Sequence, residues 1–340
     1  MSINEKYKQI KDIGEFAFIN RFESKFDQMI KDSDMGIGDD CAVVSINETQ
    51  NHVITTDLLI EDIHFLKTEI SPFELGYKSL AVNLSDIAAM GAKPLYSFLS
   101  IGIPTSTDID YLDRFMEGYH KLSQKYNVPL MGGDTTKSPD KIVINVAVIG
   151  ISEKENTHLR SMACSGDLVC VADNLGDSAA GLNILLNKIE QTSVHKKLIK
   201  QHHLPEPNIL EGMWLAKHKQ VHAMMDISDG ISSDLKHILK ASQKSADIHL
   251  DKLPISNELN SIAKKENWNA QEIAASGGED YKLLFTVDAE GFDKLNADFE
   301  KEFNKPLYLI GEINEGRSEI SWFKNKQKLA ISKMGFDHFS

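Results

Sequence analysis

Short runs of alternating apolar and polar residues recur along the whole chain, and longer segments with a helical period separate them. Residues 43–46, 53–59 and 98–103 have the alternation of strands. Residues 142–151 form the longest apolar stretch, which includes Asn145 and is far too short to span a bilayer. Strands that alternate with helices in this way are typical of an α/β or α+β protein.

A helix is predicted to begin at Ser71, because three features of a helix N-terminus coincide there. Ser71 suits the N-cap, the proline that follows suits the first turn, and Glu74 completes a capping box. The apolar period continues towards Gly91, a residue type common at helix C-termini, where we expect the helix to end. Thr107 is predicted to cap a second helix that runs towards Tyr126.

The polar and charged residues 152–156 interrupt the alternation and are the best candidate for a domain boundary. At 340 residues the chain is long enough for two domains of about 100–200 residues each. We therefore predict two α/β domains, residues 1–151 and 152–340. The elements expected in the second domain are a strand at 168–172, a helix near 179–188, a strand ending at Asp226, a helix at 233–242 and a strand at 282–287.

The composition is that of an ordinary globular protein with a surplus of acidic residues. Hydrophobic residues make up 41% of the chain and charged residues 26%, which allows a substantial core. The formal net charge of −13 argues against a general nucleic-acid binder and against docking on an anionic membrane. The N-terminus has no apolar leader, and Cys41, Cys164 and Cys170 have no metal-ligand spacing. We therefore expect a cytoplasmic protein with reduced thiols.

Acidic residues and glycines gather at predicted strand ends and turns. They occupy residues 36–40, 55–57, 132–136, 226–230 and 276–280, and Asp86 joins them from the first predicted helix. Each motif alone is a common turn or helix cap. Five in one chain favour a shared role, because carboxylates brought together repel one another unless a cation neutralises them. Hard oxygen ligands suit Mg²⁺, which bridges to substrate phosphates, so the pattern predicts phosphoryl transfer.

Other common catalytic motifs are absent from the sequence. No GxxxxGK[ST] loop occurs, which argues against a P-loop enzyme, and no EF-hand spacing supports a calcium-binding protein. Gly36 and Gly38 resemble the start of a dinucleotide fingerprint, but Cys41 stands at the third glycine position and two aspartates would oppose a pyrophosphate. There is no GxSxG elbow and no HExxH pair. The closely spaced histidines are expected to be solvated surface residues: His202, His203, His218 and His222.

Eight segments that span nearly the whole chain carry a family pattern. They are GIGDDCAVV (36–44), TTDLLIEDIHF (55–65), YKSLAVNLSDIAAMGAKP (77–94), GGDTT (132–136), GDSAAGL (176–182), DISDGISSDL (226–235), SGGEDYKLLF (276–285) and GFDHF (335–339). In this order they resemble the thiamine-monophosphate kinase family, within the superfamily that contains aminoimidazole ribonucleotide synthetase and selenophosphate synthetase. The set NLSDIAAMGAKP, SGGEDY and GFDHF favours the kinase over these relatives.

The resemblance implies ATP-dependent phosphorylation of thiamine monophosphate to thiamine diphosphate, the last step in making that cofactor, with several Mg²⁺ ions. It also implies an N-terminal domain that binds ATP and metal and dimerises through its sheet, and a C-terminal domain that completes the substrate site. Carried over by motif, the metal ligands are Asp40, Thr55, Thr56, Asp57, Asp86, Asp134, Asp226 and Asp229. The residues expected to meet ATP are Gly133, Asp134, Arg160 and Ser228. Those expected to contact thiamine monophosphate are His64, Glu279 and Phe336.

The implied mechanism needs no general base. The acceptor is a phosphate monoester, and its second pKa of about 6 leaves it mostly dianionic at neutral pH. The main barrier is repulsion between two polyanions, which metals lower by neutralising and aligning them for in-line transfer. The residues expected to act in catalysis, through metal, are Asp57, Asp86, Asp134 and Asp226.

Two other functions fit parts of the sequence. Another ATP enzyme of the same superfamily, acting on a ribonucleotide amide, would share the acidic motifs. A non-catalytic module that senses divalent metal or a nucleotide would also keep them, but it has no use for His64, Glu279 and Phe336. Of these three, Phe336 suits a flat cationic ring, because an aromatic face attracts a cation.

Overall fold

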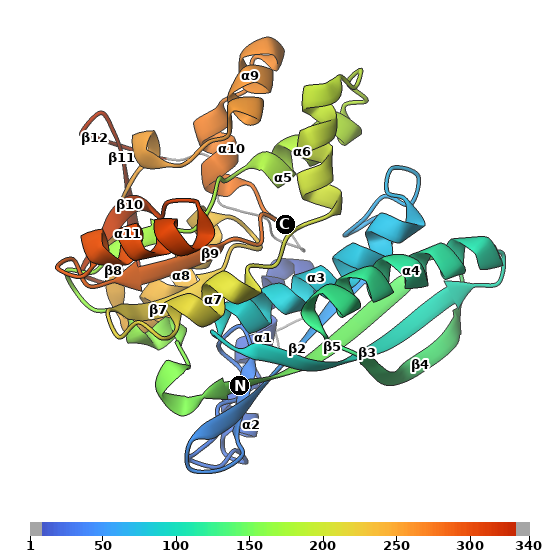
Figure 1. The fold of residues 1–340 in the computed structure, drawn as a ribbon, viewed down its shortest axis with the longest axis horizontal. Helices are drawn as coiled ribbons and strands as arrows, with labels where there is room; N and C mark the ends of the chain where they lie inside the picture. The colour runs from blue at the N-terminus through green and yellow to red at the C-terminus, as the bar shows by residue number, and fades with distance from the viewer. Residues whose placement is uncertain (1–8, 331–340) are drawn as a thin grey trace, which may run out of the picture.

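Two β-sheets from successive parts of the chain organise the computed structural model, which describes residues 9–330. Sheet 1 has the strand order β1-β2-β5-β3-β4, and sheet 2 has the order β12-β11-β8-β10-β6-β9-β7. The chain passes from sheet 1 to sheet 2 between Glu153 and Leu168. Figure 1 shows the two sheets side by side, with sheet 1 at the lower right. The predicted class, a two-domain mixed α/β fold, is confirmed.

The first part of the chain supplies sheet 1 and the helices that pack on it. The strands of sheet 1 are β1 (Ala42–Ser45), β2 (Gln50–Ile60), β3 (Lys93–Pro104), β4 (Leu130–Ser138) and β5 (Val143–Glu153). The helices described here are α1 (Gly14–Asn20), α2 (Glu23–Asp27), α3 (Pro72–Ala89) and α4 (Ile109–Tyr126). All pairs in sheet 1 are antiparallel except β3 with β4, which is parallel.

The second part supplies sheet 2 and most of the shorter helices. The strands of sheet 2 are β6 (Leu168–Val171), β7 (Val221–Asp226), β8 (Lys244–His249), β9 (Leu283–Val287), β10 (Tyr308–Glu315), β11 (Ile320–Lys324) and β12 (Gln327–Leu329). The α-helices described here are α5 (Asp177–Leu186), α6 (Ser193–His203), α7 (Ile209–Leu215), α8 (Ile231–Ser242), α9 (Asn257–Glu266), α10 (Ala270–Ser276) and α11 (Phe292–Phe303).

The start of α3 has the predicted capping box. The Glu74 backbone N–H donates to Ser71 Oγ at 3.2 Å, and the Ser71 backbone N–H donates to the Glu74 carboxylate at 3.0 Å. The prediction for the second helix is wrong by one residue, because α4 takes Asp108 as its N-cap. The Thr107 backbone N–H instead closes the preceding turn on Pro104 O at 3.0 Å, which places Thr107 outside the helix.

Helix α3 is the central element of the molecule. It packs on β2 and β5 of sheet 1, on α4 and α7, and on β7 of sheet 2. One continuous core joins α3 side chains such as Leu84 and Ile87 to Met224 and Phe285 of sheet 2. Residues on α3 therefore lie where the two sheets meet, and polar side chains there can reach groups from both.

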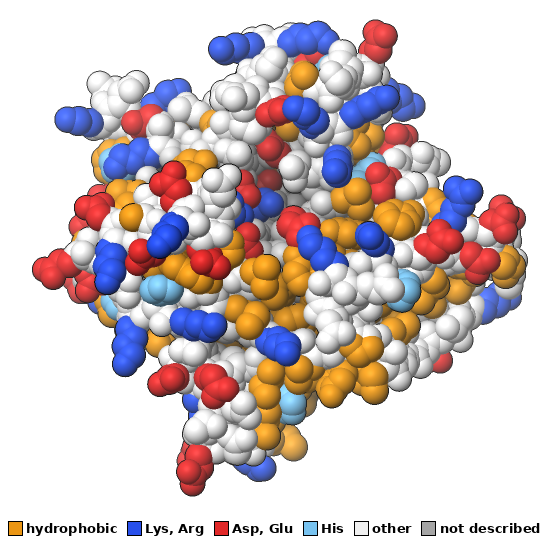
Figure 2. All heavy atoms as spheres, viewed as in Figure 1, with side chains coloured by type: hydrophobic (Ala, Val, Ile, Leu, Met, Phe, Trp, Pro, Cys, Tyr) orange, Lys and Arg blue, Asp and Glu red, His pale blue; other side chains and the backbone are white. Residues whose placement is uncertain are grey.

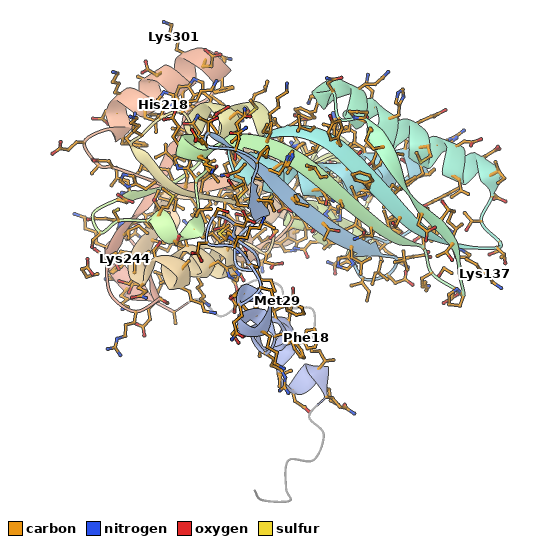
Figure 3. The ribbon with its side chains drawn as sticks, turned by 90° about the horizontal axis from the view of Figure 1, so that it is seen from below. Phe18, Met29, Lys137, His218, Lys244 and Lys301 are labelled. Atoms are coloured by element: carbon orange, nitrogen blue, oxygen red, sulfur yellow. The ribbon has the colours of Figure 1, made fainter. Side chains whose placement is uncertain are left out.

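Only one face of sheet 1 is covered by α3 and α4. Seen from below in Figure 3, the strands of sheet 1 lie uncovered over most of their length. This open face carries apolar side chains that are between 36% and 46% exposed: Val44, Ile54, Leu58, Tyr96 and Phe98. None of the helices within residues 9–330 combines the length and apolar character needed to cross a bilayer.

Candidate active site

Three aspartates from distant parts of the chain meet where α3 faces the end of β7. Single carboxylate oxygens of Asp40, Asp86 and Asp226 all lie within 4.8 Å of one another. Asp40 precedes β1, Asp86 lies near the end of α3, and Asp226 ends β7. Asp57 of β2 lies beside them, close enough for its charge to raise the pKa of both Asp86 and Asp226. We call these four residues the acidic cluster.

Neighbouring hydroxyl and amide groups fix the orientation of the acidic cluster. Thr55 Oγ1 donates to Asp86 Oδ2 at 2.5 Å, and Ser85 Oγ donates to Asp226 Oδ2 at 2.6 Å. The Asp57 backbone N–H donates to Asn83 Oδ1 at 3.1 Å. The segment Asn83–Asp86 of α3 therefore holds one aspartate from each sheet and supplies a third itself. These contacts explain why the sequence NLSD occurs at this point of α3.

Burial of these carboxylates is unfavourable for their ionised forms. Burial is the largest cause of a raised pKa at Asp57, Asp86 and Asp226, and the charge of Asp40 adds to the rise at Asp226. Asp226 is only 2% exposed. An all-oxygen donor set that gathers several carboxylates fits hard divalent cations such as Mg²⁺.

Arg160 lies against the loop that carries Asp40. Arg160 Nη2 lies 2.5 Å from Asp40 Oδ1, and the Arg160 backbone N–H donates to Asp39 Oδ2 at 2.9 Å. Burial and the charge of Asp40 raise the pKa of Asp39 to about 7. The guanidinium thus balances part of the negative charge, and Arg160 lies beside the acidic cluster.

The turn from β7 into α8 extends the acidic site. The Asp229 backbone N–H donates to Asp234 Oδ2 at 3.1 Å, and Ser228 O accepts the Glu279 backbone N–H at 2.6 Å. Burial, followed by the charges of Asp229 and Asp226, raises the pKa of Asp234 well above its usual value. Ser228 and Asp229 therefore lie between the acidic cluster and the SGGEDY loop.

Two expected metal ligands do not join the acidic cluster within one chain. In the register of sheet 1, Thr56 and Asp134 belong to the open face, whereas Thr55 and Asp57 face α3. Successive side chains of a strand point to opposite faces, so Thr56 points away from its two neighbours. Thr56 Oγ1 instead donates to Val146 O at 3.1 Å.

The motif that contains Gly133 and Asp134 is a strand, although the sequence indicated a turn. It lies inside the edge strand β4, where Asp134 is exposed. Glycine is required because a Cβ at Gly133 would lie 1.7 Å from Leu99 O, and its φ is +153°. A glycine-rich segment thus marked close backbone approach between paired strands.

The three residues expected to contact the phosphoryl acceptor differ in their surroundings. His64 follows β2, and its Nδ1 accepts the Ile60 backbone N–H at 3.0 Å. Glu279 stands in the loop before β9 with φ +62°, and its side chain is 24% exposed. Phe336 lies outside the described residues. Figure 2 shows a hollow near the centre of this face, between the part that carries α6 and α10 and the part that carries α3, with acidic and basic side chains at its rim.

The expectation for two of the histidines is wrong. His202 and His203 are 5% and 4% exposed, and both face carboxylates. His202 Nδ1 lies 3.1 Å from Glu279 Oε2, and His203 Nδ1 lies 3.6 Å from Glu74 Oε2. His202 and His203 each follow a buried apolar residue, Leu198 or Ile199, by four positions, so the helical period of α6 does indicate their burial. Only the carboxylate partners could not be predicted, because they come from other elements.

Lys78 is the main site residue that motif reasoning missed. Its side chain is fully buried, and Nζ lies 3.1 Å from Glu279 Oε1. The sequence feature that could have revealed it is a lysine seven residues before Ser85, in a part of the helix that is otherwise mostly apolar. That spacing puts both side chains on one face of the helix.

The cysteines take no part in the acidic cluster. All three are free, as predicted, with Cys164 exposed and Cys41 and Cys170 buried. Cys164, Asp167 and His222 lie within 4.8 Å of one another. There the Asp167 carboxylate already accepts the Cys164 backbone N–H at 2.8 Å and faces His222 Nδ1 at 2.9 Å. Hydrogen bonding within the group accounts for this arrangement.

Comparison with known proteins gives consistent results over most of the chain. Models of the AIR synthase related protein N-terminal and C-terminal domains match residues 38–152 and 164–323. Thiamine-monophosphate kinase of Buchnera aphidicola subsp. Schizaphis graminum is 40% identical over 333 residues, which is 96% of this chain and 99% of that protein. Thiamine-monophosphate kinase of Escherichia coli K12 is 37% identical over 329 residues, with 96% and 98% covered.

Solved structures agree with these relatives. A structure described as AaThiL complexed with AMPPCP and TMP has a TM-score of 0.85 and 32% identity, and the match covers 98% of this chain and 99% of that one. Thiamine monophosphate kinase from Aquifex aeolicus has a TM-score of 0.79 and 31% identity, with 95% and 99% covered.

Proposed function

Because this chain belongs to the thiamine-monophosphate kinase family of AIR synthase related proteins, we propose that its acidic cluster is where ATP phosphorylates thiamine monophosphate. The products are thiamine diphosphate and ADP. The observation that carries the proposal is the meeting of Asp40, Asp86 and Asp226 oxygens within 4.8 Å, from three distant segments. A structurally similar relative described with an ATP analogue and TMP supports the choice of both substrates.

The side chains of the site fit several Mg²⁺ ions. The residues that would hold them are Asp40, Thr55, Asp57, Asp86, Asp226 and Asp229, with Thr56 and Asp134 as further proposed ligands. When bound, Mg²⁺ supplies the positive charge that lets two phosphate groups approach. Ser85 and Thr55 each hold one oxygen of a cluster carboxylate, so the remaining oxygen is free to face a ligand.

The protein's own contribution to the transfer is orientation. The acceptor phosphate is already a dianion at neutral pH, so no side chain has to remove a proton from it. The residues proposed to meet ATP are Gly133, Asp134, Arg160 and Ser228. Arg160 suits phosphate oxygens because its planar guanidinium can bind two at once, as it now binds carboxylate oxygens.

The acceptor end is proposed to involve His64, Glu279 and Phe336. Glu279 has the strongest structural support, because its partly exposed carboxylate lies in the loop beside Ser228. This carboxylate can accept hydrogen bonds from the aminopyrimidine of thiamine monophosphate. Residues 1–151 would supply most of the residues that bind ATP and metal, and residues 152–340 would add the others and complete the substrate site. Since ATP is the phosphoryl donor, we place the reaction in the cytoplasm.

A homodimer is proposed to form through the open face of sheet 1. Isolated apolar side chains are common on protein surfaces, but a contiguous apolar sheet face usually marks an interface. Leu58, Tyr96 and Phe98 lie on this face together with Asp134 and Thr56. A second copy would cover the apolar side chains and place new groups next to Asp134.

The function is tested with purified protein, ATP and thiamine monophosphate, with thiamine diphosphate separated and quantified by chromatography. We expect product only when both substrates and a divalent cation are present. An aminoimidazole ribonucleotide precursor serves as the competing acceptor. Turnover of that precursor without formation of thiamine diphosphate would contradict the proposal.

A further inference from the structure

Lys78 is a fully buried lysine in the middle of α3. Its Nζ lies 3.1 Å from Glu279 Oε1 and 3.2 Å from Oε2, and among residues 9–330 these oxygens are its ion-pair partners. Removing an ammonium from water is costly, and a buried ion pair seldom stabilises a protein more than apolar residues of similar size. Stability alone is therefore a weak reason for a lysine at this position.

Glu279 has acceptor capacity that its protein neighbours do not use. A carboxylate can accept about four hydrogen bonds. Lys78 contacts both oxygens and His202 Nδ1 contacts one, while the side chain remains 24% exposed. Burial, followed by the charge of Lys78, lowers the pKa of His202 well below its usual value. The cation that balances Glu279 is consequently Lys78, and the partly exposed carboxylate keeps acceptor capacity for a ligand.

The backbone at Glu279 is also held in an unusual conformation. Its φ is +62°, in the left-handed region that non-glycine residues seldom adopt. The Glu279 backbone N–H is fixed on Ser228 O at 2.6 Å, next to the turn that carries Asp229. Such strained residues cluster at binding and catalytic sites, where the surrounding structure enforces them.

Helix α3 sets the separation between Lys78 and the acidic cluster. Ser85 and Asp86 follow Lys78 by seven and eight residues, so they lie on nearly the same face and about 10–12 Å further along the axis. One rigid element therefore carries the partner of Glu279 near its middle and the partner of Asp226 near its C-terminal end.

We propose that Lys78 is a positioning residue for thiamine monophosphate, acting through Glu279. It holds the carboxylate so that its remaining lone pairs accept the N–H groups of the aminopyrimidine, while α3 keeps the acidic cluster near the phosphate. Because Lys78 balances the charge of Glu279, this end selects hydrogen-bond donors rather than cations in general. The inference rests on the proposed function, and Lys78 itself touches neither substrate.

The test compares steady-state kinetics of Lys78→Met and Lys78→Arg. Methionine fills a similar volume without charge, so we expect KM for thiamine monophosphate to rise at least about tenfold while kcat and KM for ATP change less than about threefold. Arginine keeps a cation that can contact both carboxylate oxygens, so the KM of Lys78→Arg for thiamine monophosphate should stay within about threefold of the wild-type value. The matched control is Lys197→Met, which removes an exposed Lys–Glu pair of 2.7 Å and should change neither constant.

An unchanged KM for thiamine monophosphate in Lys78→Met would overturn the inference. A fall in kcat together with an equal rise in both KM values would also overturn it, since a loosened fold affects both substrates. If Lys78→Met is insoluble, the double variant Lys78→Met/Glu279→Gln leaves no charge at this pair and should match Glu279→Gln alone, at least about tenfold above wild type in this KM. A wild-type KM in the double variant would overturn the inference.

The wild-type enzyme separates this inference from the function on which it rests. Failure of the wild type to make thiamine diphosphate contradicts the proposed function. A fully active wild type with an unaffected Lys78→Met variant contradicts only the role of Lys78.

Discussion

The Asp226 carboxylate is 2% exposed, accepts a hydrogen bond from Ser85 at 2.6 Å, and has Asp40 and Asp86 oxygens within 4.8 Å. Burial and the charge of Asp40 raise its pKa, so its ionised form is unfavourable unless a cation is bound. A buried carboxylate in this situation contributes little to the stability of the fold, and its role in function is to attract a cation.

Asp226→Asn is expected to lower kcat by about 10²–10³-fold, because one charged ligand is lost where phosphate charge must be balanced. Without divalent cation the variant should unfold at the same temperature as the wild type or higher, since repulsion from Asp40 and Asp86 is reduced. Kinetics and thermal unfolding in EDTA measure the two effects. Asp251→Asn, which changes an exposed aspartate, is the control. A variant with wild-type kcat would exclude Asp226 from the mechanism.

At the scale of elements, α3 depends on its first turn. The His203 ring 3.6 Å away, followed by hydrogen bonds from Ser71, lowers the Glu74 pKa from 4.5 to about 2. A carboxylate whose pKa is lower in the folded than in the unfolded state stabilises the protein at pH values above its unfolded-state pKa. That contribution is lost as the pH falls from about 4.5 towards 2.

Glu74→Gln should therefore lower the free energy of unfolding by about 1 kcal/mol at neutral pH, and the difference from wild type should shrink below pH 4.5. Urea unfolding between pH 3 and 7 measures it. Glu290→Gln, at an exposed position, is the control. A difference that stays constant over this range would show that charge is not the cause.

The contact between α3 and α4 depends on a second local feature. A Cβ at Gly118 would lie 1.8 Å from Phe73 O, so Gly118→Ala should destabilise the protein by about 1–3 kcal/mol. Helix propensity alone predicts the opposite sign, a gain of about 1 kcal/mol. Denaturant unfolding decides between them, with Lys121→Ala on the exposed side of α4 as control.

Elements with strong local signals could be predicted from the sequence. The capping box at Ser71 and Glu74 located the start of α3, and alternation located β1 and β2 to within a few residues. Strand β4 was not predictable, because its glycine is required by the close approach of the Leu99 backbone on another strand. The pairing of His202 with Glu279 was likewise not predictable, because the two residues are distant in sequence.

For the whole molecule, the motifs named Asp40, Asp57, Asp86 and Asp226, which α3 brings together, but they also named Asp134, which does not join them within one chain. What the sequence could not show is the face to which each side chain points. Thr56 and Asp134 lie on the open face of sheet 1, where a second copy of the chain is proposed to bind.

The proposed dimer predicts a mass in solution of twice that of one chain. Phe98→Glu places a charge on the open face and should shift the protein towards the monomer, because a buried charge without a partner is costly. Light scattering coupled to size exclusion measures the mass. Ile109→Glu, which changes an apolar residue at the start of α4 that is 69% exposed, should leave it unchanged. A monomeric wild type at micromolar concentration would contradict the dimer.

The central claim is that aspartates from both sheets hold cations through which ATP and thiamine monophosphate react. The most direct test is the rate of thiamine diphosphate formation by the wild type as Mg²⁺ is titrated into EDTA-treated protein. The account predicts no product before Mg²⁺ is added and a rate that rises to saturation with it. Product formation that persists in EDTA, or a phosphorylated protein on the pathway, would contradict it.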